Sequence, residues 1–260
     1  MLAIEALTAF SDNYIWLLRD GSSRRCFVVD PGDAAPVLAA LQRDRLELAG
    51  VLITHHHFDH VGGLQELIKH SNPVVYGPDN PAIVGISRPL QAGAGVDVLG
   101  LEFRVMAVPG HTLDHIAFFC PGGEGQVPLL FCGDTLFAGG CGRMFEGTAP
   151  VMHASLASLA ALPAATRVYC AHEYTQANLR FAQAVEPENR KLAQRVAEVA
   201  AARERGEPTV PSELALELAT NPFLRCEEPA LVAALRRQGK WQGEKPAELF
   251  AALRSWKDAF

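Results

Sequence analysis

Residues 54–60 read Thr-His-His-His-Phe-Asp-His, directly after a short apolar run that is typical of a buried strand. Neutral imidazole is the commonest metal ligand in proteins, and a carboxylate is a good companion for divalent metals. In an extended segment alternate residues share a face, so His55, His57 and Asp59 are expected to point the same way. His56 then points the other way, and we interpret it either as a residue that supports a ligand without binding the metal or as a structural residue. A solvated loop or an affinity tag rarely concentrates four histidines around an aspartate, so the segment predicts a metal site.

One segment cannot complete such a site, because a divalent ion needs about four ligands. Three further β-rich runs end in a histidine or an aspartate, at Pro109-Gly110-His111-Thr112, Gly133-Asp134-Thr135 and His172-Glu173. Side chains delivered from several strand ends converge at one edge of a sheet, where α/β folds place their sites. Periodicity therefore predicts a mixed α/β fold with these side chains gathered at one edge.

The set His55-x-His57-x-Asp59-His60, His111, Asp134 and His172 resembles the signature of the metallo-β-lactamase superfamily. More narrowly, the whole chain resembles glyoxalase II, the family of hydroxyacylglutathione hydrolases. The motifs that carry this narrower resemblance are Ser11-Asp12-Asn13-Tyr14, Gly133-Asp134-Thr135-Leu136-Phe137, Gly140-Cys141-Gly142-Arg143, Glu146-Gly147-Thr148, His172-Glu173-Tyr174-Thr175 and Asn221-Pro222-Phe223. The histidine and aspartate set alone specifies the superfamily, and the later motifs point to this member of it.

The resemblance implies an α/β fold, an αββα metallo-β-lactamase-like sandwich followed by a smaller C-terminal helical domain. We place the catalytic domain at residues 1–173 and the helical substrate-binding domain at residues 174–260. The sequence after Thr175 has a helical pattern. Residues 188–205 are expected to form one helix, and residues 212–218 another with Ser212 as its N-cap.

Composition and charge exclude several classes of protein. The chain has 260 residues, 49% hydrophobic and 20% charged, which is enough for one large or two modest domains. A net charge of -6 argues against a nucleic-acid partner. No apolar stretch reaches the roughly 18 residues of a membrane span, and the N-terminus does not resemble a signal peptide. Six scattered cysteines without a C-x-x-C pair fit a reducing cytoplasm, and we expect a cytoplasmic monomer.

The resemblance also implies the ligand sets. His55, His57 and His111 hold one metal, Asp59, His60 and His172 hold the other, and Asp134 bridges them. Two metals ~3.5–4 Å apart share a bridging hydroxide in such centres, so Asp59 and Asp134 are the carboxylates expected to serve catalysis. Mixed nitrogen and oxygen ligation suits zinc, iron and manganese alike, and zinc is our expectation.

The implied reaction is the hydrolysis of glutathione thioesters. Hydroxide at the two metals attacks the carbonyl of S-D-lactoylglutathione, giving glutathione and D-lactate in the second step of methylglyoxal detoxification. A thioester suits this site because a thiolate, with a thiol pKa of ~8.5, departs without obligatory protonation. Arg143, Tyr174, Arg254 and Lys257 match the family's glutathione-anchoring positions. Here Arg143 replaces the family's frequent lysine, and Phe145 replaces a tyrosine and so lacks its hydroxyl.

Alternative functions would use the same residues differently. A lactonase or another thioesterase of the superfamily would keep the metals but need no basic anchors in the tail. A non-catalytic metal-binding module is the alternative from a different class, although seven ligands exceed the four of a closed zinc site. We interpret His115 as a packed histidine, and His70 and His153 as surface or helix residues. Asp114 either orients a ligating histidine or lies in an exposed loop, and Cys141 is structural.

Overall fold

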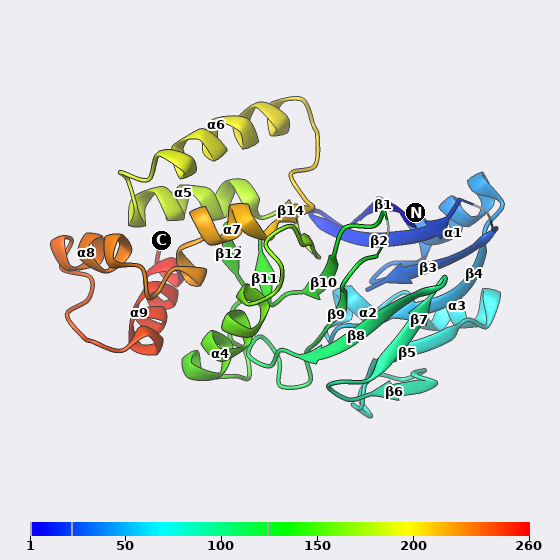
Figure 1. The fold of residues 1–260 in the computed structure, drawn as a ribbon. Coiled ribbons are helices and arrows are strands. Elements are labelled where there is room, and N and C mark those ends of the chain that lie inside the picture. The colour runs from blue at the N-terminus through cyan, green and yellow to red at the C-terminus, as the bar shows by residue number, and fades with distance from the viewer. Residues whose placement is uncertain (1, 22, 124) are drawn as a thin grey trace. The chain divides into compact units, whose positions relative to one another are not determined.

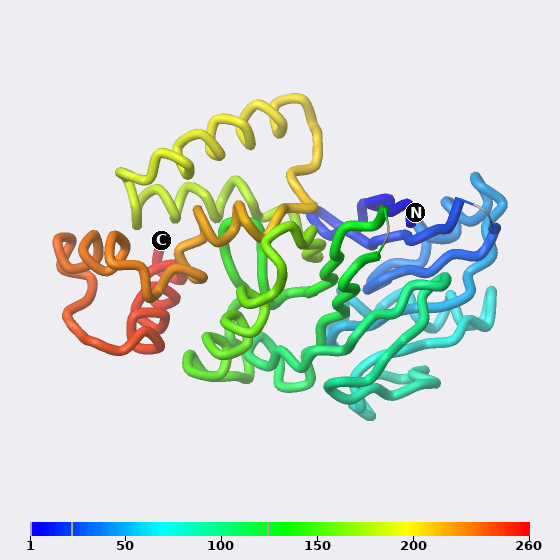
Figure 2. The backbone as a smooth tube through the Cα atoms, viewed as in Figure 1, coloured from blue at the N-terminus to red at the C-terminus, as the bar shows by residue number. Residues whose placement is uncertain are grey.

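The computed structural model describes residues 2–21, 23–123 and 125–260 (Figures 1 and 2). The chain divides into two compact units. The first unit comprises Met1–Val108 and Asp114–Gly133, and the second comprises Pro109–Leu113 and Asp134–Phe260. None of the helices in the described ranges is long and apolar enough to cross a membrane.

The first unit contains a six-stranded sheet in the order β1-β2-β3-β4-β5-β6 (Figure 1). Its strands are β1 (Leu2–Ala9), β2 (Asn13–Asp20), β3 (Arg25–Val29), β4 (Glu47–Leu52), β5 (Val74–Pro78) and β6 (Arg88–Leu90). The first two neighbouring pairs are antiparallel, and the remaining three are parallel. Parallel neighbours need a crossover connection. Helix α1 (Ala34–Asp44) links β3 to β4, and helices α2 (Phe58–Val61) and α3 (Leu64–Ser71) link β4 to β5.

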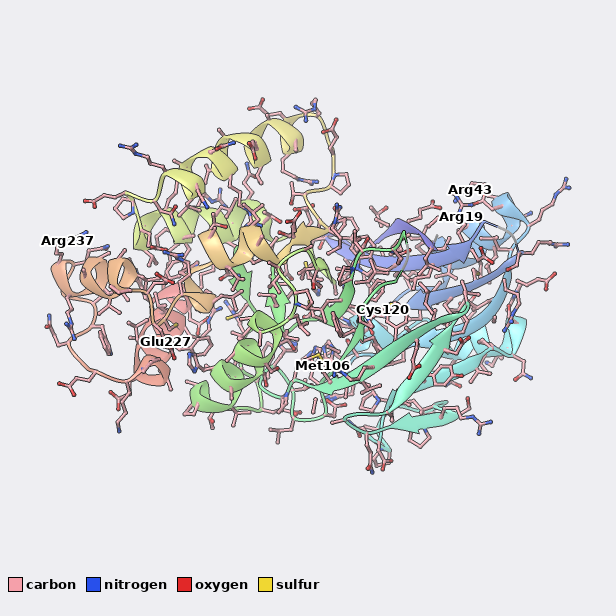
Figure 3. All side chains as sticks on the ribbon, in the orientation of Figure 1. Arg19, Arg43, Met106, Cys120, Glu227 and Arg237 are labelled. Carbon is pink, nitrogen blue, oxygen red and sulfur yellow. The ribbon has the colours of Figure 1, made fainter. Side chains whose placement is uncertain are left out.

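Four strands of the first unit form an antiparallel meander. They are β7 (Gly95–Val98), β8 (Leu101–Ala107), β9 (Ile116–Cys120) and β10 (Leu129–Gly133), each paired with the next. Every residue of β9 and β10 is buried. Figure 3 shows Met106 on β8 and Cys120 on β9. Strands buried on both faces read as continuous apolar runs, which is how β9 and β10 appear in the sequence.

The core of the first unit joins the helices to the first sheet. The apolar face of α1 contributes Val37 and Leu41, and α3 contributes Leu64 and Leu67, at helical spacing. They pack in one cluster with strand residues such as Val51. Burying each such side chain contributes ~1.5–3 kcal/mol. The cluster therefore holds β4 firmly just before the histidine-rich segment begins.

An exposed ion-pair cluster lies at one end of the first unit, where Figure 3 labels Arg19 and Arg43. Arg43 Nη2 lies 2.7 Å from both Asp44 Oδ2 and Glu5 Oε1, and Arg19 Nη1 lies 3.3 Å from Asp44 Oδ2. The hydrogen bond to Arg43 lowers the pKa of Asp44 below its ordinary value. These charges are exposed and solvent-screened, so they are not a main source of stability.

The second unit is largely helical. Its strands are β11 (Leu136–Phe137), β12 (Gly140–Cys141), β13 (Arg167–Cys170) and β14 (Ser212–Glu213). Its helices are α4 (Ala149–Ala160), α5 (Thr175–Val185), α6 (Arg190–Glu204), α7 (Leu214–Thr220), the 3-10 turn η1 (Pro222–Leu224), α8 (Pro229–Arg237) and α9 (Pro246–Asp258). Helices α5 and α6 pack side by side through Leu179, Ala182, Leu192 and Val199 (Figure 1).

Two local predictions were wrong. Ser212 is not a helix cap, because it pairs with Val168 as part of β14 and its hydroxyl donates to the buried carboxylate of Glu217. Helix α7 begins at Leu214 instead. The histidine segment is not extended as far as Asp59, because α2 begins at Phe58. The domain boundary between residues 173 and 174 stays a prediction.

Candidate metal centre

The first unit brings four of the predicted ligands together after β4. His55 and His57 lie in the irregular segment that follows the strand, and Asp59 and His60 lie on α2. The turn before α1 packs tightly against α2. A Cβ added to Gly32 would lie 1.9 Å from the carbonyl oxygen of Asp59, so only glycine fits there. This close approach fixes the position of α2 and of the two ligands that it carries.

A buried carboxylate that was not predicted as functional orients two of these ligands. Asp30, only 4% exposed, directly follows β3. Its Oδ1 accepts a 2.7 Å hydrogen bond from the backbone N–H of Thr54. Its Oδ2 accepts from Thr54 Oγ1 at 2.7 Å and from His60 Nδ1 at 3.0 Å. In the sequence this residue reads as part of a turn, although an aspartate at a strand end fits the pattern of the other ligands.

These hydrogen bonds determine the imidazole tautomers. A carboxylate only accepts, so His60 Nδ1 carries the proton and its Nε2 carries the lone pair. The hydroxyl proton of Thr54 goes to Asp30, so Thr54 Oγ1 accepts from His55 Nδ1 at 3.1 Å. His55 therefore also presents the lone pair of Nε2.

The lone pairs of the first unit face other electron-rich atoms. His60 Nε2 lies 3.5 Å from Asp59 Oδ2, and His55 Nε2 lies 3.1 Å from His57 Nδ1. Acceptors brought this close repel one another unless a cation or a proton lies between them. These four side chains therefore fit a metal ion by their chemistry, because they present imidazole nitrogen and carboxylate oxygen.

Two other histidines near these ligands have structural contacts. His56 Nδ1 lies 2.9 Å from Asp114 Oδ1, and Asn80 Nδ2 donates to Asp114 Oδ2 at 2.7 Å. His56 thus turns toward Asp114, and Asp114 orients this histidine. The buried ring of His115 stacks on that of His55, with centroids 4.6 Å apart and planes 14° apart. His115 is therefore packed, as its interpretation from the sequence proposed.

The second unit brings the remaining three predicted ligands together. Asp134, 7% exposed, lies between two buried imidazoles. Its Oδ2 is 3.4 Å from His111 Nε2, and its Oδ1 is 3.3 Å from His172 Nε2. His111 Nδ1 donates to the carbonyl oxygen of Arg143 at 2.8 Å, so its Nε2 carries the lone pair. One carboxylate thus presents a separate oxygen to each of two imidazoles.

Aromatic side chains surround the ligands of the second unit. Tyr174 stacks on His172, with ring centroids 4.7 Å apart and planes 6° apart. Phe137 meets His172 edge-on at 5.8 Å and Tyr174 at 5.3 Å. Phe145, 64% exposed, meets His111 edge-on at 5.3 Å. These contacts restrict both imidazole rings, and they place Tyr174 beside the predicted ligand His172.

Of the other three predicted anchors, Arg143 and Arg254 lie against Asp258, and Lys257 Nζ donates to the carbonyl oxygen of Ala177 at 3.3 Å. Arg254 Nη2 donates to Asp258 Oδ1 at 2.9 Å, and Arg143 Nε lies 3.6 Å from the same atom. Arg254 is buried and also donates to the carbonyl oxygen of Cys141 at 3.1 Å. Desolvation, then the charge of Arg254, lowers the pKa of Lys257 to about 8. Burial raises the pKa of Cys141 to about 11, so it is a thiol rather than a nucleophile.

Comparison with known proteins places this fold and site in one class. Residues 9–172 match the metallo-beta-lactamase superfamily, and residues 173–260 match the hydroxyacylglutathione hydrolase C-terminus. The chain is thus a metal-dependent hydrolase with a metallo-β-lactamase domain and a C-terminal helical domain, and the predicted fold class is confirmed. It belongs to the hydroxyacylglutathione hydrolase family, as its resemblance predicted.

Individual relatives agree with this placement. The chain is 56% identical to a hydroxyacylglutathione hydrolase of Ectopseudomonas mendocina strain ymp, over 100% of both chains. The structure is similar to ETHE1 from Myxococcus xanthus, with a TM-score of 0.65, 25% identity and 99% of each chain covered. It is also similar to TTHA1623 in a di-iron-bound form, with a TM-score of 0.58 and 27% identity over 85% of this chain and 100% of that one.

Proposed function

We propose that the seven predicted ligands together hold two divalent metal ions in an enzyme that hydrolyses S-(2-hydroxyacyl)glutathione. The ligands are His55, His57, Asp59, His60, His111, Asp134 and His172, grouped as the family resemblance implies. Within each unit, imidazole lone pairs face a carboxylate or another imidazole, which supports metal binding. In the second unit, the two oxygens of Asp134 face different imidazoles, which supports its role as the bridge.

The ligand atoms do not select a single metal. Imidazole and carboxylate suit zinc, iron and manganese, and we propose zinc. When bound, two such ions act as Lewis acids and lower the pKa of water toward ~7. TTHA1623 was solved with two irons, so iron is the alternative to test.

The protein's own groups prepare the ligands before substrate arrives. Asp30 keeps the protons of His60 and, through Thr54, of His55 on Nδ1, which leaves Nε2 available in both rings. The carbonyl oxygen of Arg143 does the same for His111. Such partners orient a ligand and raise its basicity. Because these hydrogen bonds already hold the imidazole rings, the rings need little reorientation when a metal binds.

The anchors bind the glutathione part of the substrate. Arg143 is well exposed and can bind a carboxylate through two N–H groups, as a guanidinium does. Lys257 carries a positive charge below pH about 8. Phe145 offers an apolar edge where the family often has a hydroxyl, so one polar contact is absent. The glutathione sulfur leaves as a thiolate, because its thiol pKa of ~8.5 makes protonation by a general acid unnecessary.

The observation that carries this proposal is the family match of residues 173–260, since a lactonase needs no such tail. Purified protein should hydrolyse S-D-lactoylglutathione and contain two metals per chain. The controls are a γ-lactone and a lactoyl thioester of N-acetylcysteamine, which lacks the glutathione carboxylates. Lactone hydrolysis without hydrolysis of the glutathione thioester would overturn the proposal in favour of a lactonase. Bound metal without any hydrolysis would favour a non-catalytic module.

We further propose that the protein acts in the cytoplasm as a monomer. All six cysteines lie in the described ranges, where they are buried and form no disulfide, which fits a reducing compartment. Size-exclusion chromatography with light scattering tests the oligomeric state. A mass near 56 kDa, about twice the 28.1 kDa of one chain, would show a dimer.

A further inference from the structure

The short hairpin of β11 and β12 connects the helical tail to the ligands of the second unit. It begins two residues after Asp134 and carries Phe137, whose ring meets His172 and Tyr174 edge-on. Leu136 pairs with Cys141 and Phe137 pairs with Gly140, so the turn lies at residues 138 and 139. Gly139 has a φ of 69°, a value that favours glycine. Such a small hairpin has little stability of its own.

Side chains from α5 and from the end of α7 hold this turn. Asn221 Nδ2 donates to the carbonyl oxygen of Phe137 at 3.2 Å and to that of Gly140 at 2.9 Å. Glu217 Oε2 accepts from the backbone N–H of Gly139 at 2.8 Å. Asn178 Nδ2 donates to the carbonyl oxygen of Ala138 at 3.2 Å.

These groups are themselves held rigidly. Glu217 and Asn221 are fully buried, and Asn221 Nδ2 also lies 3.1 Å from Glu217 Oε2. The other carboxylate oxygen of Glu217 binds the buried guanidinium of Arg195 and the hydroxyl of Ser212. A buried polar network in which every member has a partner specifies one arrangement, because any shift leaves a group without its hydrogen bond.

We propose that Asn221 and Glu217 are positioning residues for the metal centre, acting through the hairpin on Phe137 and thereby on His172. This inference rests on the proposed function, because it takes His172 as a metal ligand. When the turn is clamped, Phe137 restricts the ring of His172 from its edge while Tyr174 covers one face. When the clamp is lost, the imidazole samples more orientations and binds a metal less tightly.

Asn221→Ser is the most informative variant. A serine at this position can still accept from the N–H of Phe223, as Asn221 Oδ1 does at 3.1 Å, but it is too short to reach the hairpin carbonyls. Asn189→Ser is the matched control. Asn189 likewise caps a helix by accepting from Leu192 N–H at 3.1 Å, and likewise donates to a backbone carbonyl, that of Ala219, but it does not contact the hairpin.

The main readout is zinc affinity, measured by competition with a chromophoric chelator. Asn221→Ser should weaken zinc binding by about tenfold, the scale on which partners of a ligand act. Asn189→Ser should leave it within twofold of the unchanged protein. Urea unfolding of both variants separates a loss of stability from a loss of metal affinity. With S-D-lactoylglutathione, kcat should fall, and KM should rise as well, because the hairpin also contacts two predicted anchors, Tyr174 through Phe137 and Arg254 through Cys141.

A double-mutant cycle that combines Asn221→Ser with Phe137→Leu tests whether Asn221 acts on His172 through Phe137. If Asn221 acts through Phe137, the losses in zinc affinity should be clearly less than additive. Additive losses would overturn that route, and an unchanged zinc affinity in Asn221→Ser would overturn the whole inference. If Asn221→Ser does not fold, Glu217→Gln, with Glu186→Gln as its control from the buried Glu186–Arg225 pair, gives the same comparison. Failure of the unchanged protein to hydrolyse the glutathione thioester would refute the proposed function without affecting the zinc comparison.

Discussion

The substitution Asp30→Asn removes one charge and changes one atom at the point where His55 and His60 are oriented. Asparagine tolerates the left-handed φ of 51° at this position, so the backbone is not strained. Its side-chain oxygen can still accept from the N–H of Thr54. Its amide group, however, replaces the oxygen that accepts from Thr54 Oγ1 and from His60 Nδ1.

The consequence is a change in tautomer. The amide of the new asparagine is a donor, so His60 Nδ1 must become the acceptor and its proton moves to Nε2. That nitrogen is the one proposed to bind the metal. We expect metal affinity to fall by ~10–100-fold, as it does when the hydrogen-bond partner of a ligand is removed. Imperfect pairing of these buried groups should also lower the free energy of unfolding by ~1–3 kcal/mol.

Asp33→Asn is the control, because Asp33 lies three residues away and its carboxylate caps α1 by accepting from Ala35 N–H at 2.9 Å. Asparagine caps a helix about as well as aspartate, so neither stability nor metal binding should change much. Chelator competition gives the affinities, and urea denaturation gives the free energies of unfolding. If Asp30→Asn binds two zinc ions as tightly as Asp33→Asn, the tautomer argument is wrong.

Four further outcomes are expected. Asp134→Ala should lose two-metal occupancy, measured by elemental analysis, and nearly all hydrolysis, and a fully active variant with two metals would contradict the bridging role. His56→Ala should retain metal far better than His57→Ala, because His56 turns toward Asp114, and the reverse order would show that the ligands are misassigned. Lys257→Ala should raise KM for glutathione thioesters by roughly 10- to 150-fold, the equivalent of a charge-assisted hydrogen bond of ~1.5–3 kcal/mol, with unchanged metal content and a smaller effect at high salt. Since desolvation lowers the pKa of Lys257 from 10.5 to about 8, its charge is present below that pH and is lost above it. The KM of the unchanged protein should therefore rise as pH increases through about 8, and a similar rise in Lys257→Ala would assign it to another group.

The sequence by itself determined the chemical class of the site. Imidazole and carboxylate placed after short apolar runs predict a metal centre, because side chains at strand ends converge whatever the details of the fold. The alternation argument separated His56 from His55 and His57, and the structure agrees, since all three precede α2 and His56 turns toward Asp114 while His55 and His57 lie against each other. It was wrong to extend the strand to Asp59, because the chain turns into α2 at Phe58 and periodicity over a few residues cannot show where an extended segment ends. Periodicity also indicated the helical tail, and the family motifs supplied what periodicity could not, which is membership of the hydroxyacylglutathione hydrolase family.

Only the tertiary structure decided which groups orient the ligands. Asp30 and Thr54 are 24 residues apart in the chain, and Asn221 lies 81 residues from Gly140, so no local pattern connects them. Ser212 shows the same limitation, since a serine before an apolar helix is a good N-cap by sequence but here its hydroxyl binds a buried carboxylate. Buried polar groups form such hydrogen bonds because they have lost their contacts with water, and each one pairs with a group that the fold brings near it. That partner is set by the packing of distant segments, and the local sequence does not contain it.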